Sequence, residues 1–230
     1  MPQEYIREVK TRSNAEWGLD RPFYAGFEEA AITMLWGVTN VSGTVAHSSD
    51  EALRGKQSCK INTGLTTPLA GDEAFINKSF GIMNPLVTTV EFQLNNYQNS
   101  QQVFDLQTKL SYKKTGKFYR PGILLAMDGT NTTISIYTNT QAAAIVLETV
   151  ANPIQTGLWQ AFSFRFNPQT EKLIDAVIFG KYYDLSSQPV CTSFPIVLTT
   201  TSFVTLTLRT LENVRKLIYV DDFVVDQGTI

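Results

Sequence analysis

The sequence predicts an almost all-β fold, an antiparallel sandwich of two sheets in a jelly-roll arrangement, for three reasons. Short segments alternate apolar and polar residues with a period of two, which is typical of strands with one buried face. Turn signals separate these segments. Hydrophobic residues make up 43% of the 230 residues but charged residues only 17%, and Thr, Ser, Asn and Gln fill the difference, as in strands with one solvated face.

The alternation is clearest in four segments, 87–94, 132–138, 159–166 and 202–209. Each places β-branched, aromatic or aliphatic residues on one side and mostly polar residues on the other, with Ala161 and Phe203 as exceptions. The residues expected to face the core are Val90, Phe92, Leu94, Ile134, Ile136, Phe162, Phe164, Phe166, Val204, Leu206 and Leu208. We therefore expect these segments to cover a shared apolar core.

Turn residues lie between the predicted strands. Asp128-Gly129 predicts a hairpin between 123–127 and 132–137, and Lys114-Thr115-Gly116-Lys117 predicts another. Segment 167–170, Asn-Pro-Gln-Thr, separates the Phe-rich strand from the next one. Segment 141–149 has the alanine content of a helix, but the apolar residues at 145–147 and at 150 favour a strand.

The number of predicted strands decides the architecture. About twelve to fifteen short strands are too many for a small barrel and suit two stacked sheets of about six or seven strands. Residues 1–20 lack periodicity and are interpreted as an N-terminal arm or first strand, and 21–230 as one β-sandwich domain. No linker or internal repeat divides the chain.

Composition excludes several function classes. The formal net charge is −2, so no basic excess is present to neutralise the phosphates of a nucleic acid. No apolar run is long enough to cross a bilayer. The first five residues, Met-Pro-Gln-Glu-Tyr, contain no signal-peptide core, which predicts a cytoplasmic protein or a mature secreted form. Cys59 and Cys191 are either free buried thiols or one long-range disulfide.

Familiar catalytic patterns are missing, so no catalytic residue is assigned. His47 is the single histidine, and no G-x-S-x-G elbow accompanies it. Catalytic zinc sites need several His or Cys ligands. Concanavalin-like glucanases use an E-x-D-x-x-E strand that this sequence lacks.

Sugar binding requires less: an aromatic face for the apolar side of a pyranose, and amide, carboxylate or guanidinium groups for its hydroxyls. Candidate ligand-binding residues are Tyr112, Tyr119, Arg120, Tyr137, Trp159 and Arg165, with Gln93, Asn95 and Arg209 as further polar neighbours. The alternative for each aromatic is a packing role, because strands are rich in such residues. Segment 112–120 joins four positive charges to three aromatics, either as a loop for an anionic ligand or glycan, or as a solvated hairpin tip whose lysines block edge pairing.

Three segments resemble the concanavalin A-like lectin and glucanase superfamily, which includes the laminin-G-like domains. The first runs from Phe23-Tyr24-Ala25-Gly26-Phe27-Glu28 through Trp36 to 52–61, a pattern of the form A-x-x-G-x-x-S-x-K-I. The second is 157–164, with a tryptophan before an alternating Phe strand, and the third is 218–225, Ile-Tyr-Val-Asp-Asp-Phe-Val-Val. The resemblance supports the jelly-roll fold more than any activity.

In such families a structural calcium ion often ties the first and last strands together. The resemblance implies Glu28, with Glu29 as a further candidate, and Asp221 and Asp222 as its ligands. Carboxylate oxygens are suitable ligands for calcium. The alternative is that Asp221 and Asp222 bond to neighbouring backbone. No other cofactor is implied.

Three hypotheses about function follow. The leading one is a non-catalytic carbohydrate-binding protein that uses surface aromatics. The second is a structural or assembly protein, such as a virion or surface-layer component, which predicts a stable oligomer. The third is a glycoside hydrolase or polysaccharide lyase with an unrecognised site, although an enzyme is not favoured.

Overall fold

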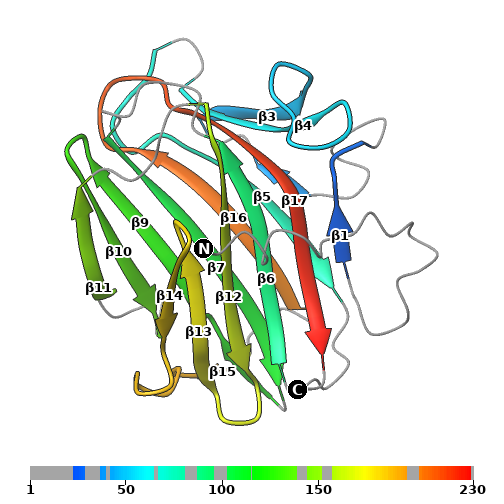
Figure 1. The fold of residues 1–230 in the computed structure, drawn as a ribbon, viewed down its shortest axis with the longest axis vertical. Helices are drawn as coiled ribbons and strands as arrows, with labels where there is room; N and C mark the ends of the chain where they lie inside the picture. The colour runs from blue at the N-terminus through cyan, green and yellow to red at the C-terminus, as the bar shows by residue number, and fades with distance from the viewer. Residues whose placement is uncertain are drawn as a thin grey trace.

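The computed structural model describes residues 23–28, 37–39, 42–64, 67–80, 87–95, 103–114, 116–138, 144–151, 157–195 and 202–228. Within these ranges every regular element is a strand, and the strands form two packed antiparallel sheets (Figure 1). The predicted all-β, two-sheet jelly-roll sandwich is therefore confirmed. The expected arm at 1–20, together with Glu29 and Trp36, lies outside the described residues.

The front sheet, which faces the viewer in Figure 1, has the strand order β14-β13-β12-β6-β17-β4-β3, with β1 also paired to β17. Its strands are β1 (Phe23–Ala25), β3 (Gly43–Ser48), β4 (Ser58–Thr63), β6 (Val87–Asn95), β12 (Trp159–Asn167), β13 (Lys172–Ile178), β14 (Lys181–Asp184) and β17 (Leu217–Gly228). The last strand, β17, thus lies inside the sheet between segments from the first half of the chain.

The back sheet has the order β11-β10-β9-β7-β16-β5-β2. Its strands are β2 (Gly37–Thr39), β5 (Glu73–Phe80), β7 (Val103–Lys114), β9 (Gly122–Asp128), β10 (Asn131–Tyr137), β11 (Ile145–Ala151) and β16 (Ser202–Thr210). A short strand, β8 (Lys117–Tyr119), pairs with the end of β7 and with β15 (Phe194–Pro195). In both sheets the central strands come from distant parts of the chain, so the core forms only when the whole domain folds.

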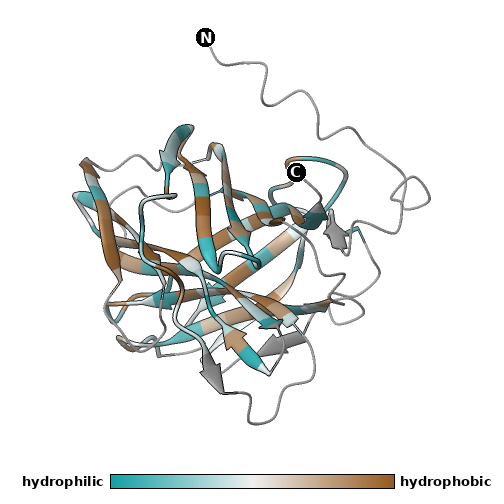
Figure 2. Cartoon of the chain, turned by 90° about the horizontal axis from the view of Figure 1, so that it is seen from below, coloured by the Kyte–Doolittle hydropathy of each residue, from teal (hydrophilic) through white to brown (hydrophobic). Residues whose placement is uncertain are grey.

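The inner faces of the two sheets form one apolar core, and the alternation of hydrophobic and hydrophilic residues along the strands is visible in Figure 2. All eleven residues that the sequence analysis placed on the buried face are at most 2% exposed. Aromatic rings link neighbouring strands of the front sheet: Phe92 stacks on Phe162 at 5.4 Å and on Phe223 at 5.6 Å between ring centroids. Each buried Phe contributes roughly 1.5–3 kcal/mol through removal of apolar surface from water.

The turn predictions are confirmed. β9 and β10 form a hairpin in which the Asp128 carboxylate accepts hydrogen bonds from the amides of Thr130 and Asn131 at 2.8 and 2.6 Å, while Gly129 takes a φ of 91°. In the 167–170 turn the Asn167 amide oxygen accepts from the Gln169 and Thr170 amides. Of the two alternatives for 141–149, the described residues adopt the strand β11.

Two further questions left by the sequence are answered. Cys59 and Cys191 are buried thiols that are not joined in a disulfide. Burial raises the pKa of the Cys191 thiol to about 12, so this thiol stays protonated at neutral pH. The described segments contain no helix with the length and apolar character needed to cross a membrane.

Candidate functional site

The outer face of the back sheet carries polar side chains along its central strand, β7. Phe104, Leu106 and Leu110 point into the core, so Asp105, Gln107 and Lys109 point outward. Successive outward residues on a strand lie about 7 Å apart, which places the three side chains in a row along the sheet. We call the surface formed by Asp105, Gln107, Lys109, Tyr137 and Arg209 the β7 face.

Tyr137 joins this face because a glycine lies between it and β7. In the strand register Gly122 of β9 pairs with Lys109 on one side and with Tyr137 on the other. With no side chain at Gly122, Lys109 reaches across β9, and its Nζ lies 4.6 Å from the centroid of the Tyr137 ring. The same Nζ donates to Gln107 Oε1 at 2.8 Å. A cation–π contact and a hydrogen bond therefore hold the ammonium group in place.

Arg209 joins the face from the other side of β7. It lies on β16, opposite Asp105 of β7 and opposite Glu73 of β5. Within the described part of the chain, neither the Asp105 carboxylate nor the Arg209 guanidinium forms a hydrogen bond or an ion pair. The two groups are near enough for the Arg209 charge to lower the pKa of Asp105, which opposes the effect of burial. The Arg209 guanidinium, a donor, and the Asp105 carboxylate, an acceptor, therefore lie side by side, and both can still form hydrogen bonds with a ligand.

The β7 face is partly withdrawn from water. Burial raises the pKa of Asp105, lowers the pKa of Lys109 and raises the pKa of Tyr137, in each case as the largest cause. The charge of Arg120 lowers the pKa of Lys109 further, whereas the charge of Glu73 raises it. The charge of Asp105 raises the pKa of Tyr137 further, whereas the charge of Arg209 lowers it. Partial desolvation strengthens any polar contact that a ligand makes here, because the local dielectric constant is lower than that of bulk water.

Apolar side chains flank the polar row. In the register, Gln107 of β7 pairs with Leu124 of β9 and with Thr207 of β16, and Thr207 pairs with Phe75 of β5. Leu124 and Phe75 are both half-buried on the outer face. The face therefore combines acceptors, donors and apolar surface across four neighbouring strands.

Arg120 approaches the same face from the β7–β8 hairpin. Lys113 pairs with Phe118, so Phe118 and Arg120 share the outer face with Lys109 and Lys113. The Arg120 guanidinium carbon lies 4.9 Å from the centroid of the Phe118 ring, which in turn lies 6.2 Å from the ring of Phe203 on β16. Two of the six predicted ligand residues, Arg120 and Tyr137, are thus brought to one face.

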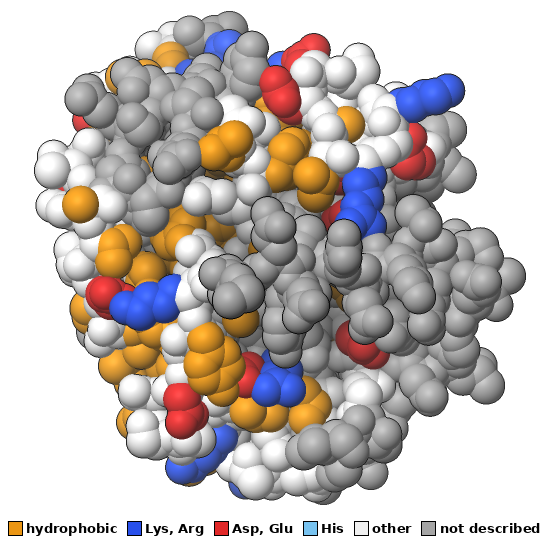
Figure 3. All heavy atoms as spheres, in the orientation of Figure 1, with side chains coloured by type: hydrophobic (Ala, Val, Ile, Leu, Met, Phe, Trp, Pro, Cys, Tyr) orange, Lys and Arg blue, Asp and Glu red, His pale blue; other side chains and the backbone are white. Residues whose placement is uncertain are grey.

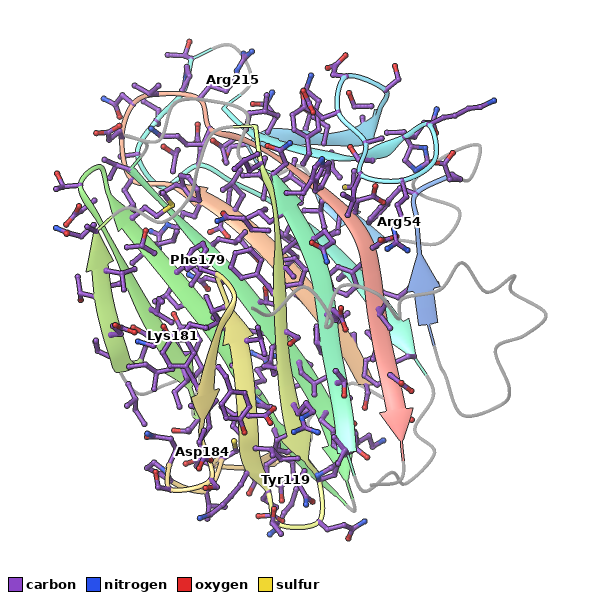
Figure 4. All side chains as sticks on the ribbon, viewed as in Figure 1. Arg54, Tyr119, Phe179, Lys181, Asp184 and Arg215 are labelled. Carbon is purple, nitrogen blue, oxygen red and sulfur yellow. The ribbon has the colours of Figure 1, made fainter. Side chains whose placement is uncertain are left out.

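Tyr112 and Tyr119 are not surface aromatics, and this part of the prediction is corrected. Each is 1% exposed and packs against Phe166 of the front sheet, with centroid separations of 5.8 and 6.2 Å. The Tyr119 hydroxyl donates to Glu171 Oε1 at 2.5 Å (Tyr119 is labelled in Figure 4). The physical reason is strand parity: Tyr112 shares the inward face of β7 with Leu110, and Tyr119 is its cross-strand partner in the hairpin.

Trp159 and Arg165 lie on the other sheet. Both belong to β12 and alternate with the buried Phe162, Phe164 and Phe166, so they point outward from the front sheet. On this side of the molecule, charges of both signs stand among apolar side chains (Figure 3). The Arg165 Nε donates to Asp175 Oδ1 at 2.7 Å and its Nη2 to Oδ2, to which the Tyr182 hydroxyl also donates at 3.2 Å. These groups already satisfy one another, and they cannot reach a ligand held on the β7 face.

The residues expected to bind calcium surround one loop. Asp221 Oδ2 accepts from the amides of Leu53 and Arg54 at 3.0 and 3.2 Å, and Arg54 Nε lies 3.2 Å from Asp222 Oδ2 (Figure 4). Glu28 Oε1 accepts from the amides of Lys56 and Gln57 at 2.7 and 2.9 Å. These contacts fix the loop at the point where β17 stops pairing with β4 and begins to pair with β1. We call this set of contacts, made by Glu28, Asp221 and Asp222, the β17 clasp.

This donor set does not match what calcium needs. N–H and guanidinium groups face the three carboxylates, whereas calcium takes six to eight oxygen ligands. Among the residues that the structure describes, no three His, Cys, Asp or Glu side chains are placed to hold a metal ion. Burial raises the pKa of Asp221 to about 6 although three amides bond to it. The calcium site implied by the resemblance is therefore not expected at this loop, and metal removal tests that expectation.

Sequence reasoning missed Asp105, Gln107 and Lys109. The signal was present, because 103–110 alternates apolar and polar residues as clearly as the four segments that were recognised. Their neighbours in space, Tyr137 and Arg209, lie 28 or more positions away along the chain, so no local pattern joins them.

No protein-family model matches the chain, and no curated protein matches its sequence. Solved structures do match. The protein described as cellulose induced protein, Cip1, has a TM-score of 0.56 at 12% identity, covering 90% of this chain and 98% of its own. The carbohydrate esterase vb_24B_21 of Shiga toxin-encoding bacteriophage phi24B has a TM-score of 0.54 at 14% identity, covering 85% and 91%.

A legume lectin-like domain from Entamoeba histolytica has a TM-score of 0.51 at 12% identity, covering 84% of this chain and 89% of its own. The CBM2 module of the evolved Dit of Lactobacillus casei BL23 phage J-1 also has a TM-score of 0.51, at 11% identity, covering 90% and 95%. At this level of identity the likeness concerns the fold. The chain shares with these solved structures its fold, an antiparallel sandwich of two sheets.

Proposed function

We propose that this protein binds a glycan and that the β7 face is its binding surface. One observation carries the proposal. Asp105 and the Tyr137 hydroxyl lie on one partly desolvated face beside the exposed Arg209, and within the described residues the polar groups of all three keep unused hydrogen-bonding capacity. Buried and half-buried polar groups are ordinarily paired, so a set of unpaired ones that converge is typical of a ligand site.

The chemistry of the face suits a sugar. A carboxylate such as Asp105 accepts from two hydroxyls, and a guanidinium such as that of Arg209 donates to two. Leu124 and Phe75 supply apolar surface for the C–H side of a pyranose. No metal and no nucleophile is needed, which agrees with the lack of a recognised catalytic motif.

The structural comparisons support the same function. Among the structures with TM-scores above 0.5 are one described as a legume lectin-like domain, one described as a CBM2 module and one described as a carbohydrate esterase. Because one fold hosts many functions, these likenesses support a glycan ligand but do not decide between binding and catalysis.

A glycan array followed by calorimetric titration of the best ligand tests the proposal. Tyr137→Phe and Arg209→Gln each remove polar groups from the β7 face. A hydrogen bond to a charged or partly desolvated group is worth about 1.5–3 kcal/mol, so affinity should fall about ten- to hundredfold. Trp159→Ala is the matched control on the other sheet and should leave affinity unchanged.

The outcomes separate the alternatives. Loss of binding with Trp159→Ala but not with the β7-face variants would move the site to the front sheet. Absence of binding across a broad array, with a stable oligomer by light scattering, would overturn glycan binding and favour the assembly function. Cleavage of a bound glycan would show an enzyme.

A further inference from the structure

Three cations gather at the β8 end of the β7 face. Lys109 and Lys113 point outward from β7, and Arg120 follows β8 on the same side. Lys109 and Arg120 are close enough for the charge of Arg120 to lower the pKa of Lys109. The three residues therefore concentrate positive charge on one part of a chain whose formal net charge is −2.

These cations lack carboxylate partners. Elsewhere in the described part of the chain five cations pair with acids, namely Lys60 with Asp50, Lys181 with Glu148, Lys216 with Glu212, Arg54 with Asp222 and Arg165 with Asp175, although Arg209 and Lys117 do not. Among the same described residues, Lys109, Lys113 and Arg120 form no ion pair. Like charges brought together without a counter-ion are unfavourable unless a bound anion compensates them.

Aromatic rings hold the two inner cations in position. Lys109 lies over Tyr137 at 4.6 Å and Arg120 over Phe118 at 4.9 Å, measured from Nζ and from the guanidinium carbon to the ring centroids. A cation fixed in this way loses less rotational freedom when it meets a ligand, and it keeps N–H donors that the ring does not use. The site is thus preorganised for an anionic oxygen group.

We propose that the glycan bound by the β7 face carries an acidic group, and that Lys109 and Arg120 bind this group. The inference rests on the proposed glycan-binding function and adds the class of sugar. The acidic group is a carboxylate, as in a uronic or sialic acid, or a phosphate or sulfate ester; all present the oxygens that ammonium and guanidinium groups bind.

The charges also orient the ligand. Asp105 lies four residues before Lys109 on the same strand, about 13 Å away along β7. Glu73 lies on the other side of Arg209 from Asp105, because Arg209 pairs with both residues across neighbouring strands. Glu73 is also near enough to Lys109 for its charge to raise the pKa of Lys109. Both carboxylates repel an acidic group, so we expect the acid on the side of Lys109 that faces Arg120, and neutral hydroxyls at Asp105 and Arg209.

Matched glycan pairs test the inference by titration calorimetry. Oligogalacturonides are compared with their carboxyl-reduced neutral counterparts, sulfated heparin fragments with desulfated ones, and mannose 6-phosphate glycans with mannose glycans. We expect about tenfold or greater preference for the acidic member of at least one pair, weakened by added salt because the contact is electrostatic. The pair that shows the preference identifies the carboxylate, the sulfate or the phosphate as the acid.

Arg120→Gln should abolish that preference by weakening binding of the acidic member, and Arg120 is exposed, so its replacement does not disturb the core. Lys117→Gln removes the same charge from the opposite side of the same hairpin and should change nothing. Equal affinity for acidic and neutral members would overturn the inference while glycan binding stands. No binding to either member of any pair would overturn both.

Discussion

Gly122 is the position where one methyl group should disturb both the fold and the site. A Cβ added there would lie 2.2 Å from the carbonyl oxygen of Thr108 and 3.0 Å from the Cα of Lys109. It would also lie 3.2 Å from Cγ of Lys109, the side chain that crosses Gly122 to reach Tyr137. The first contact is with backbone, so β7 and β9 must move apart where they pair.

The size of the effect follows from these contacts. Overpacking a well-filled site costs about 1–3 kcal/mol, and a backbone clash belongs at the upper end of that range. We expect Gly122→Ala to lower the free energy of unfolding by about 2–3 kcal/mol. For a domain of this size, the melting temperature should then fall by roughly 4–12 °C. Urea titration should show a lower midpoint at unchanged m-value. Affinity for an acidic glycan should also fall, because Lys109 is displaced.

Gly228→Ala is the control, since a Cβ there meets nothing within 4 Å. It should change the free energy of unfolding by less than about 0.5 kcal/mol. If Gly122→Ala unfolds at the same urea concentration as wild type and binds glycan equally well, then Lys109 does not lie across Gly122 as described. The account of the β7 face would then be refuted.

Burial raises the pKa of Asp221 from 3.8 to about 6, so the folded state binds the Asp221 proton more tightly than the unfolded state does. Protonated Asp221 therefore adds to the free energy of unfolding below pH 4, and this addition is lost as the pH rises through 6. Between pH 4 and 7 the free energy of unfolding of the wild type should fall by about 3 kcal/mol because of Asp221, and Asp221→Asn should abolish this fall. If the urea midpoints of the variant change with pH as those of the wild type do, the raised pKa of Asp221 is contradicted. Tyr119→Phe removes the hydroxyl that donates to Glu171 and should cost about 1–2 kcal/mol in urea titration, and equal stability would show that the bond contributes nothing. Because burial raises the pKa of Tyr119 to about 12, an ultraviolet titration of wild type should show its ionisation only near that pH. N–H and guanidinium donors face the carboxylates of Asp221 and Asp222 at the β17 clasp, so EDTA should shift the melting temperature by less than about 1 °C. A larger fall that calcium reverses would establish a metal site.

The fold was largely predictable because strand alternation is a local property. Phe162, Phe164 and Phe166 are two positions apart and must share a face in any strand, and they do. β11 was ambiguous because alanines favour a helix while Ile145, Leu147 and Val150 favour a strand. Pairing with β10 and partial burial of these three side chains against the core favour the strand.

The candidate site was less predictable because it depends on which strands are neighbours. Parity already placed Tyr112 with Leu110 and Leu106 on an inward face, and that signal was overlooked in favour of the charges around it. By contrast, nothing in the sequence near Tyr137 indicates that Lys109 would cross a glycine to reach it. The same holds for Arg209, which the pairing of β16 with β7 brings to Asp105.

By itself, the sequence determined that the chain is a two-sheet β-sandwich, where its hairpins turn, and which side of each recognised strand is buried. These features depend on residues within a few positions of one another, through the two-residue period of a strand and the backbone preferences of Asp, Asn and Gly. Only the tertiary structure decided that Tyr137 and Arg120 share one outer face while Trp159 and Arg165 lie on the other. The two-residue period of a strand shows only that each strand has two faces. The order of the strands decides which side chains meet on each face, and that order is set by packing across the whole core.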